Sequence, residues 1–137
     1  MTTTFIDASF WIALRSRSAP EHPRAVAIGR RLAAERSFLA CTDLVFAEVY
    51  AYFSRMRLLR EQVIRDFWQN PIVRFQEPTY EDKTHAIEVL REHKDKTYSF
   101  CDAVSFMLMH RLKIRRVASF DIHFRQFGEF EVVEAAD

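Results

Sequence analysis

The hydrophobic positions of the chain fall into two patterns: short contiguous runs and longer stretches with helical spacing. Five short apolar runs predict strands, at Thr2–Ile6, Phe38–Thr42, Ile72–Gln76, Arg116–Phe120 and Phe130–Val133. Seven stretches predict helices, at Ala8–Arg15, Pro23–Arg36, Asp43–Met56, Leu58–Gln69, Thr79–His93, Ser99–Leu112 and Asp121–Phe127. Because strands and helices alternate, we expect an α/β fold with a parallel sheet and helices on both of its faces.

Capping signals mark the ends of several predicted helices. Thr79 with Asp82, and Ser99 with Asp102, have the residue types and spacing that open a helix, and Pro71 ends the helix before it. In a parallel sheet, ligands bind beyond the carboxyl ends of the strands, where the strand order reverses. We therefore expect catalytic or ligand-binding residues at that edge of the sheet.

Composition narrows the class of protein. Of the 137 residues, 49% are hydrophobic and 28% are charged, which is typical of one soluble globular domain over residues 1–137. Glycine occurs only at Gly29 and Gly128, so the chain has no glycine-rich dinucleotide or phosphate loop. Cys41 and Cys101 lie in apolar runs, which favours buried, reduced thiols.

The N-terminal sequence MTTTFIDASF lacks a basic segment and carries Asp7 within its apolar run, so it does not resemble a signal peptide. No apolar stretch approaches the ~20 residues that a membrane helix needs. We therefore expect a cytoplasmic protein with no membrane association.

The net charge of +1 combines two unequal halves: residues 1–76 carry +4 and residues 77–137 carry −3. Arginine supplies 16 of the 20 cations. Guanidinium groups bind phosphate in a bidentate manner, so this bias is compatible with a polyanionic partner. A solvated, arginine-rich surface is the alternative interpretation.

Carboxylates within apolar runs are the most informative chemical feature. The segments FIDASFWIAL, LVFAEVYAYF, YSFCDAVSFMLM and VASFDIHF each hold one carboxylate and no lysine or arginine; these are Asp7, Glu48, Asp102 and Asp121. An unpaired buried carboxylate costs several kcal/mol, so it must be paired, protonated or bound to metal.

The predicted elements place these carboxylates near one another. Asp7 and Asp121 follow strands, and Asp102 and Glu48 lie near the starts of helices. If they converge at one edge of the sheet, a divalent cation relieves their repulsion, and an all-oxygen site suits Mg²⁺ or Mn²⁺. Taken singly, the aspartates can instead be plain helix caps, and Glu48 can pair with a distant arginine.

The four segments, in this order and spacing, resemble the PIN-domain ribonucleases, and in particular the VapC-type toxins of toxin–antitoxin pairs. The resemblance implies a three-layer α/β/α sandwich around a central parallel sheet. It also implies an Mg²⁺- or Mn²⁺-dependent endonuclease that cuts single-stranded RNA.

The resemblance places the family's acidic cluster, which binds metal and catalyses cleavage, on Asp7, Glu48, Asp102 and Asp121. It places the supporting hydroxyls on Ser9 and Ser119. The family often has threonine at the position of Ser119, and often has glycine in the turn after the Asp102 helix, where this chain reads Leu112-Lys113-Ile114.

Partners are also expected. The RNA strand would be held by arginines near the acidic segments: Arg15, Arg17, Arg24, Arg55, Arg57, Arg115 and Arg116. The apolar helix pair over residues 43–69 indicates burial against another chain, and the family forms homodimers and complexes with a small antitoxin. For His123, two residues after Asp121, we expect a structural or surface role.

Other functions stay open at this point. A related nuclease without an antitoxin would have the same sequence features, and a neighbouring antitoxin gene would separate the two. A non-catalytic nucleic-acid-binding or protein-binding module is disfavoured because all four acids are present. A phosphatase that forms an aspartyl-phosphate would want Asp-x-Asp after the first strand, but Ala8 and Ser9 follow Asp7.

Overall fold

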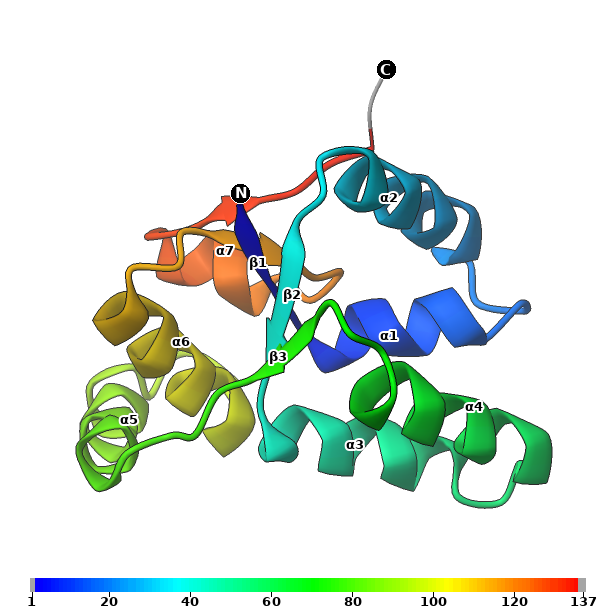
Figure 1. Ribbon diagram of the computed structural model, residues 1–137. Coiled ribbons are helices and arrows are strands. Elements are labelled where there is room, and N and C mark those ends of the chain that lie inside the picture. The colour runs from blue at the N-terminus through cyan, green and yellow to red at the C-terminus, as the bar shows by residue number, and fades with distance from the viewer. Residues whose placement is uncertain (1, 136–137) are drawn as a thin grey trace.

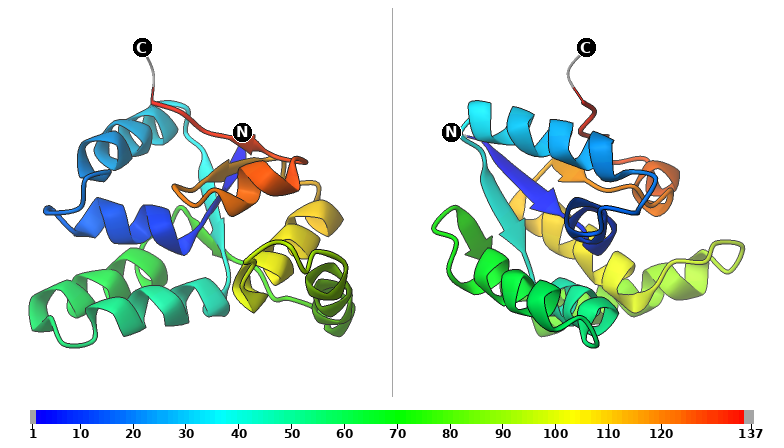
Figure 2. Two further views of the ribbon diagram at one scale, coloured as in Figure 1. Left: turned by 180° about the vertical axis from the view of Figure 1, so that it is seen from behind. Right: turned by 90° about the vertical axis from the view of Figure 1, so that its right-hand side faces the viewer.

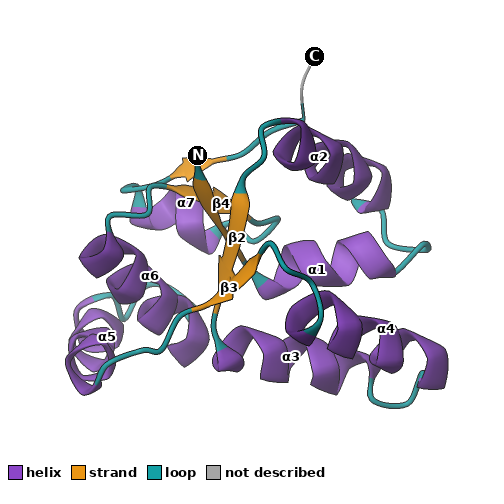
Figure 3. Ribbon diagram, in the orientation of Figure 1, coloured by secondary structure: helices purple, strands orange, loops and turns teal. Residues whose placement is uncertain are grey.

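The computed structural model describes residues 2–135, and its centre is a parallel sheet of five strands. The strands are β1 Thr3–Ile6, β2 Phe38–Cys41, β3 Val73–Phe75, β4 Arg116–Ala118 and β5 Glu131–Val132. Their spatial order is β3-β2-β1-β4-β5, and every neighbouring pair is parallel (Figures 1 and 3). The expected α/β class is confirmed.

Seven helices surround the sheet within the described residues. They are α1 Ala8–Arg15, α2 His22–Ala34, α3 Asp43–Phe53, α4 Arg57–Trp68, α5 Tyr80–Glu92, α6 Phe100–Leu112 and α7 His123–Phe127. Helices α1–α4 lie on one face of the sheet and α5–α7 on the other, which gives the three layers (Figures 1 and 2). Between residues 2 and 135, no helix has the length and apolar character needed to span a membrane.

Strand order determines where a ligand can bind. From β1 the chain moves to β2 and β3 on one side, and it returns through α5 and α6 to β4 on the other side of β1. The connections therefore diverge between β1 and β4, and the crevice at the carboxyl ends of these strands is the switch point of the sheet. Ile6 is paired with Ala118, so Asp7 and Ser119 follow side by side at this crevice.

Local sequence explains the helix starts. Thr42 caps α3 by accepting a hydrogen bond from the Val45 backbone N–H at 3.3 Å. The capping boxes of α5 and α6 form as their sequences predict. Strands β1 and β4 are buried from Thr4 and Val117 onward, as expected where helices cover both faces of a parallel sheet.

Three local details add to or change the sequence-based expectation. Helix α7 begins at His123, two residues later than expected, and Asp121 lies in the turn before it, with Oδ1 accepting from the His123 N–H. The last strand has only two residues, because only Arg116 and Val117 of β4 pair with it. Lys113, after α6, has a φ of 58°, the left-handed conformation that favours the glycine often found there.

A buried ion pair joins α1 to α4. Arg15 Nε and Nη2 donate to the two carboxylate oxygens of Asp66 at 2.5 and 2.7 Å, and Gln62 donates to the same carboxylate at 2.9 Å. The side chain of Asp66 is 7% exposed, and that of Arg15 is 33% exposed. Arg15, a candidate RNA contact from the sequence, is thus engaged within the protein.

We expect Arg15→Ala to lower the free energy of unfolding by about 1–3 kcal/mol, because Asp66 would be left buried without its counter-charge. Urea denaturation measures the change, and Arg17→Ala, at a neighbouring exposed position, is the control. Unchanged stability together with weakened RNA binding would instead place Arg15 on the RNA surface.

Candidate active site

Asp7 is at the N-terminal end of α1, but its carboxylate does not cap the helix. The Ser9 and Ser119 hydroxyls donate to Asp7 Oδ2 at 3.0 and 2.9 Å, and only 4% of Asp7 is exposed. The plain-cap interpretation therefore does not account for this residue. Its carboxylate is held by groups from α1 and from the loop after β4.

The two serines tie the ends of β1 and β4 together. Ser9 Oγ accepts from the Phe120 N–H at 2.9 Å, and Ser119 Oγ accepts from the Asp121 N–H at 3.0 Å. The two hydroxyl oxygens are also 3.1 Å apart. Each hydroxyl has a single proton, and when both donate to Asp7, neither proton is left for a hydrogen bond between the serines. The Asp7 N–H also donates to the Ala118 carbonyl at 3.1 Å.

Asp102 has two roles at the start of α6. Its Oδ2 accepts from the Ser99 N–H at 2.9 Å, while its own N–H donates to Ser99 Oγ at 3.0 Å, which completes the capping box. The same Oδ2 lies 2.6 Å from Nδ1 of His123. The capping interpretation is correct for Asp102, and the residue also faces the other acids.

His123 lies between two of the carboxylates. Its Nδ1 is 2.6 Å from Asp102 Oδ2 and 3.0 Å from Asp121 Oδ1, and its backbone N–H donates to Asp121 Oδ1 at 3.1 Å. Nε2 is 3.0 Å from the Thr97 hydroxyl, and the ring packs edge-on against Tyr98. These contacts give His123 a structural role at the site. Its position two residues after Asp121 was the only signal of this in the sequence.

Glu48 lies toward the same cluster from α3, but its side chain is exposed. Partial burial raises the pKa of its carboxylate, and the charges of Asp102 and Asp121 raise it further. No arginine or lysine lies within ion-pair distance of Glu48 among residues 2–135. Glu48 thus forms the solvent-facing side of the cluster.

Burial and like charge act together on Asp7. Desolvation is the larger cause and the charge of Asp102 the second, and together they raise the pKa of Asp7 from 3.8 to about 6. The hydrogen bonds from Ser119 and Ser9 act in the opposite direction. The site holds a carboxylate whose ionisation is unfavourable unless positive charge is supplied.

The residues fit a divalent cation. One ligand atom from each of Asp102, Asp121 and His123 lies within 4.8 Å of the others, and Asp7 adds a buried charge beside Asp102. The carboxylate oxygens are hard ligands. His123 already holds both carboxylates through Nδ1, which suits it to orienting ligands.

The sequence-predicted arginines divide among three environments. Arg15 and Arg116 form ion pairs within the protein, with Asp66 and with Glu35. Those on the exposed surface are Arg17, Arg55, Arg57 and Arg115, while Arg24 lines a cavity that also contains Asp121.

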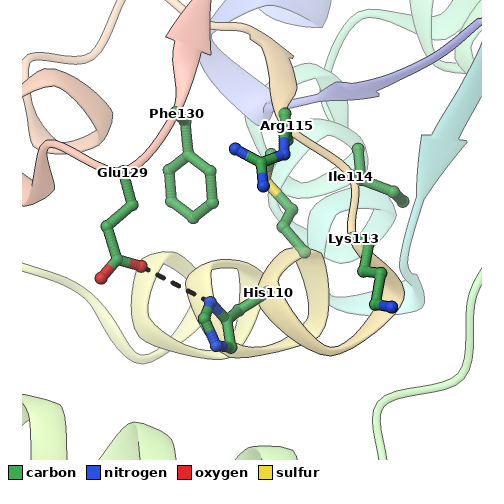
Figure 4. A pocket seen from close by; sticks show the side chains of 7 residues that line it. His110, Lys113, Ile114, Arg115, Glu129 and Phe130 are labelled. Atoms are coloured by element: carbon green, nitrogen blue, oxygen red, sulfur yellow. Dashed lines mark ion pairs between the residues drawn. The ribbon is translucent and has the colours of Figure 1, made fainter.

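Arg115 lies away from the acids, because it precedes β4 whereas Asp121 follows it. It lines a cavity of about 560 Å³ with His110, Lys113 and Phe130, in which His110 faces Glu129 at 3.7 Å (Figure 4). A contact from Arg115 to RNA would therefore be at a distance from the cleavage position.

Comparison with known proteins agrees with this geometry. Residues 4–129 match the profile of the PIN domain. The chain is 31% identical to the 23S rRNA-specific endonuclease VapC20 of Mycobacterium tuberculosis, over 93% of this chain and 96% of that protein. The crystal structure of VapC20, described as a sarcin–ricin loop cleaving toxin, superposes with a TM-score of 0.81 at 27% identity, over 94% of this chain and 98% of the other.

A second solved structure shares the fold. It is VapBC2 from Rickettsia felis bound to a promoter DNA fragment, with a TM-score of 0.71 at 10% identity, over 96% of this chain and 98% of the other. A sandwich that gathers carboxylates where its strand order reverses has the donor groups for a divalent cation at that edge. This chain belongs to the PIN-domain family, and its similarity is to the VapC-type endonucleases.

Asp7 should make stability depend on pH when no divalent metal is present. Its pKa is about 6 in the folded protein and 3.8 as a model group, so protonation favours the folded state below pH 4 and this stabilisation is lost as pH rises through 6. We expect wild type to lose up to about 3 kcal/mol of unfolding free energy across this window relative to Asp7→Asn.

Urea unfolding at pH 4, 5, 6 and 7 in metal-free buffer measures the difference. The exposed Asp43 on α3 supplies a matched variant, Asp43→Asn, which should follow wild type. Parallel pH profiles for wild type and Asp7→Asn would contradict the role of burial and charge crowding at Asp7.

Proposed function

We propose that the chain is a single-domain, Mg²⁺- or Mn²⁺-dependent endoribonuclease that hydrolyses phosphodiester bonds in single-stranded RNA in the cytoplasm. The observation that carries this proposal is the convergence of Asp7, Asp102 and Asp121 at the crevice between β1 and β4. Membership of the PIN-domain family and the endonuclease name of the mycobacterial relative support RNA cleavage.

Asp7, Asp102 and Asp121 would hold the metal, with Glu48 at the open side. An oxygen-rich site suits Mg²⁺ or Mn²⁺, and such an ion supplies an activated water and neutralises charge on the phosphate. Ser9 and Ser119 orient the Asp7 carboxylate, and His123 orients those of Asp102 and Asp121.

Glu48 is suited to handling the proton of the attacking water. Its carboxylate is exposed on the open side of the cluster and has no arginine or lysine partner among residues 2–135. A carboxylate at such a position would orient or deprotonate water that approaches the site from solvent.

The surface beside the acids can accept a strand. Two cavities, of about 540 and 250 Å³, share Glu21, Phe120 and Asp121. One continues past Ser9 to Tyr52 and the other reaches Arg24. An extended single strand can pass through both while one of its phosphates lies beside Asp121.

We further propose that the chain is the toxin of a toxin–antitoxin pair. The descriptions of the two relatives, a cleaving toxin and a VapBC assembly, support this assignment. A small antitoxin protein that places an arginine among the carboxylates would block the site, because guanidinium and carboxylate groups pair in a bidentate manner.

A homodimer through α3 and α4 belongs to the same proposal. Four large apolar side chains on or between these helices are at least half exposed: Tyr52, Met56, Leu58 and Trp68. Leu58 is 86% exposed. Exposed apolar side chains concentrated on one helix pair favour burial against a second copy of the chain.

Asp7→Asn and Asp102→Asn should each abolish cleavage of a single-stranded RNA in the presence of Mg²⁺ or Mn²⁺. Each change keeps the shape of the side chain but removes a charge that holds the ion. Gel assays of a labelled RNA measure the loss, circular dichroism verifies the fold, and Asp43→Asn is the control. Undiminished cleavage by both variants would exclude these residues as ligands.

Light scattering at micromolar concentration should give the mass of a dimer, or of a complex with a co-purifying antitoxin. Leu58→Glu should shift the dimer toward the monomer, because it places a charge in the apolar contact. Ile87→Glu, at an exposed apolar position of α5, is the control for the introduced charge. A strictly monomeric wild type with no bound peptide would contradict the proposed dimer.

A further inference from the structure

A small cavity adjoins the acidic site on the side of α2 and α7. Its volume is about 250 Å³, and its lining includes Ser119 and Asp121 from the acidic site together with Arg24 and Arg125. The remaining lining residues are Glu21, Phe120 and Ile122. The cavity thus places two guanidinium groups next to a proposed metal ligand.

The two arginines come from different layers and meet at one carboxylate. Arg24 of α2 lies 3.6 Å from Glu134 through Nη2 and Oε2, and Arg125 of α7 pairs with the other oxygen of the same carboxylate. The Arg24 guanidinium also lies over the Phe120 ring, 5.1 Å from its centre. All three charged side chains are more than half exposed.

The backbone of the C-terminal segment holds Glu134 in this position. The Arg31 guanidinium donates to the Glu134 carbonyl at 2.7 Å. The preceding Val133 is buried, and its N–H donates to the Val117 carbonyl at 2.9 Å. The backbone at Glu134 is therefore anchored, while its carboxylate forms only exposed ion pairs.

We propose that Arg24 and Arg125 form a subsite for a phosphate of the RNA strand next to the cleaved bond, and that Glu134 occupies this subsite until RNA displaces it. This inference rests on the proposed ribonuclease function. Exposed ion pairs contribute little to stability, so a phosphate can readily replace the Glu134 carboxylate. Both anions suit the guanidinium fork.

The position of the cavity favours RNA over an acidic protein as the ligand. A strand with one phosphate at Asp121 must pass its neighbouring phosphates through the two adjoining cavities. Both linings include Glu21 and Asp121, but the larger cavity has no lysine or arginine, whereas the smaller one has Arg24 and Arg125. The two arginines therefore lie where a neighbouring phosphate would be.

The test is binding of a fluorescein-labelled single-stranded RNA in metal-free buffer, measured by anisotropy at several salt concentrations. Arg24→Ala and Arg125→Ala should each weaken binding about 3- to 10-fold and reduce the salt slope by about 0.7 per lost phosphate contact. Glu134→Gln should tighten binding about 3-fold, because it removes the competing charge.

Matched controls come from the N-terminal end of α5, where Asp82 pairs with Arg111 near the end of α6, at the opposite end of α6 from Asp102. Lys83→Ala and Glu81→Gln change exposed residues there by the same charges, and both should leave RNA affinity near that of wild type. In the Arg24→Ala/Arg125→Ala background, Glu134→Gln should have no effect, since the glutamate acts only through these arginines. Thermal melting verifies that each variant is folded.

The outcomes separate this inference from the function on which it rests. If wild type binds and cleaves RNA but the arginine variants bind it normally, the subsite is wrong and the ribonuclease stands. An equal gain in RNA affinity from Glu134→Gln and from Glu81→Gln would overturn the competition by Glu134. If the arginine variants bind RNA normally but no longer bind a cognate antitoxin, Arg24 and Arg125 form a binding site for the antitoxin instead. Wild type that neither binds nor cleaves RNA would overturn the proposed function itself.

Discussion

The confinement of like charges at the carboxyl ends of β1 and β4 is the constraint on which the rest of the structure depends. Asp7 is buried beside the charge of Asp102, and this combination raises its pKa to about 6. Burial and neighbouring negative charge disfavour an ionised carboxylate. A cation shared among several carboxylates neutralises their repulsion and makes the cluster favourable. The surrounding structure serves to keep the carboxylates from moving apart.

Different interactions hold each carboxylate, and they determine how freely its side chain can change position. Asp7 is fixed by two hydroxyls, and Asp102 by its capping box and His123. Asp121 is in a turn and partly exposed, and Glu48 is exposed on α3. The cluster therefore has a rigid buried side and an adjustable outer side, which suits a site that must hold an ion and also admit and release a long substrate.

Sequence reasoning was strongest where the information is local. Apolar runs and capping signals predicted the strands, the helices and the parallel sheet, and carboxylates inside apolar runs indicated where charge is concentrated. Contacts between distant segments could not be predicted from the sequence. Nothing local shows that His123 bridges Asp102 and Asp121, that Arg15 is committed to Asp66, or that Glu134 meets Arg24, because each depends on how separate elements pack.

The pairing of β1 with β4 also has a consequence for biosynthesis. Asp7 receives its hydrogen bond from Ser119 across 112 positions of the chain, and the intervening β2 and β3 lie on the other side of β1. A nascent chain on the ribosome cannot assemble the acidic site until β4 and the turn after it have emerged. Translation thus delays the appearance of hydrolytic capacity until the chain from Asp7 through Ser119 has been synthesised.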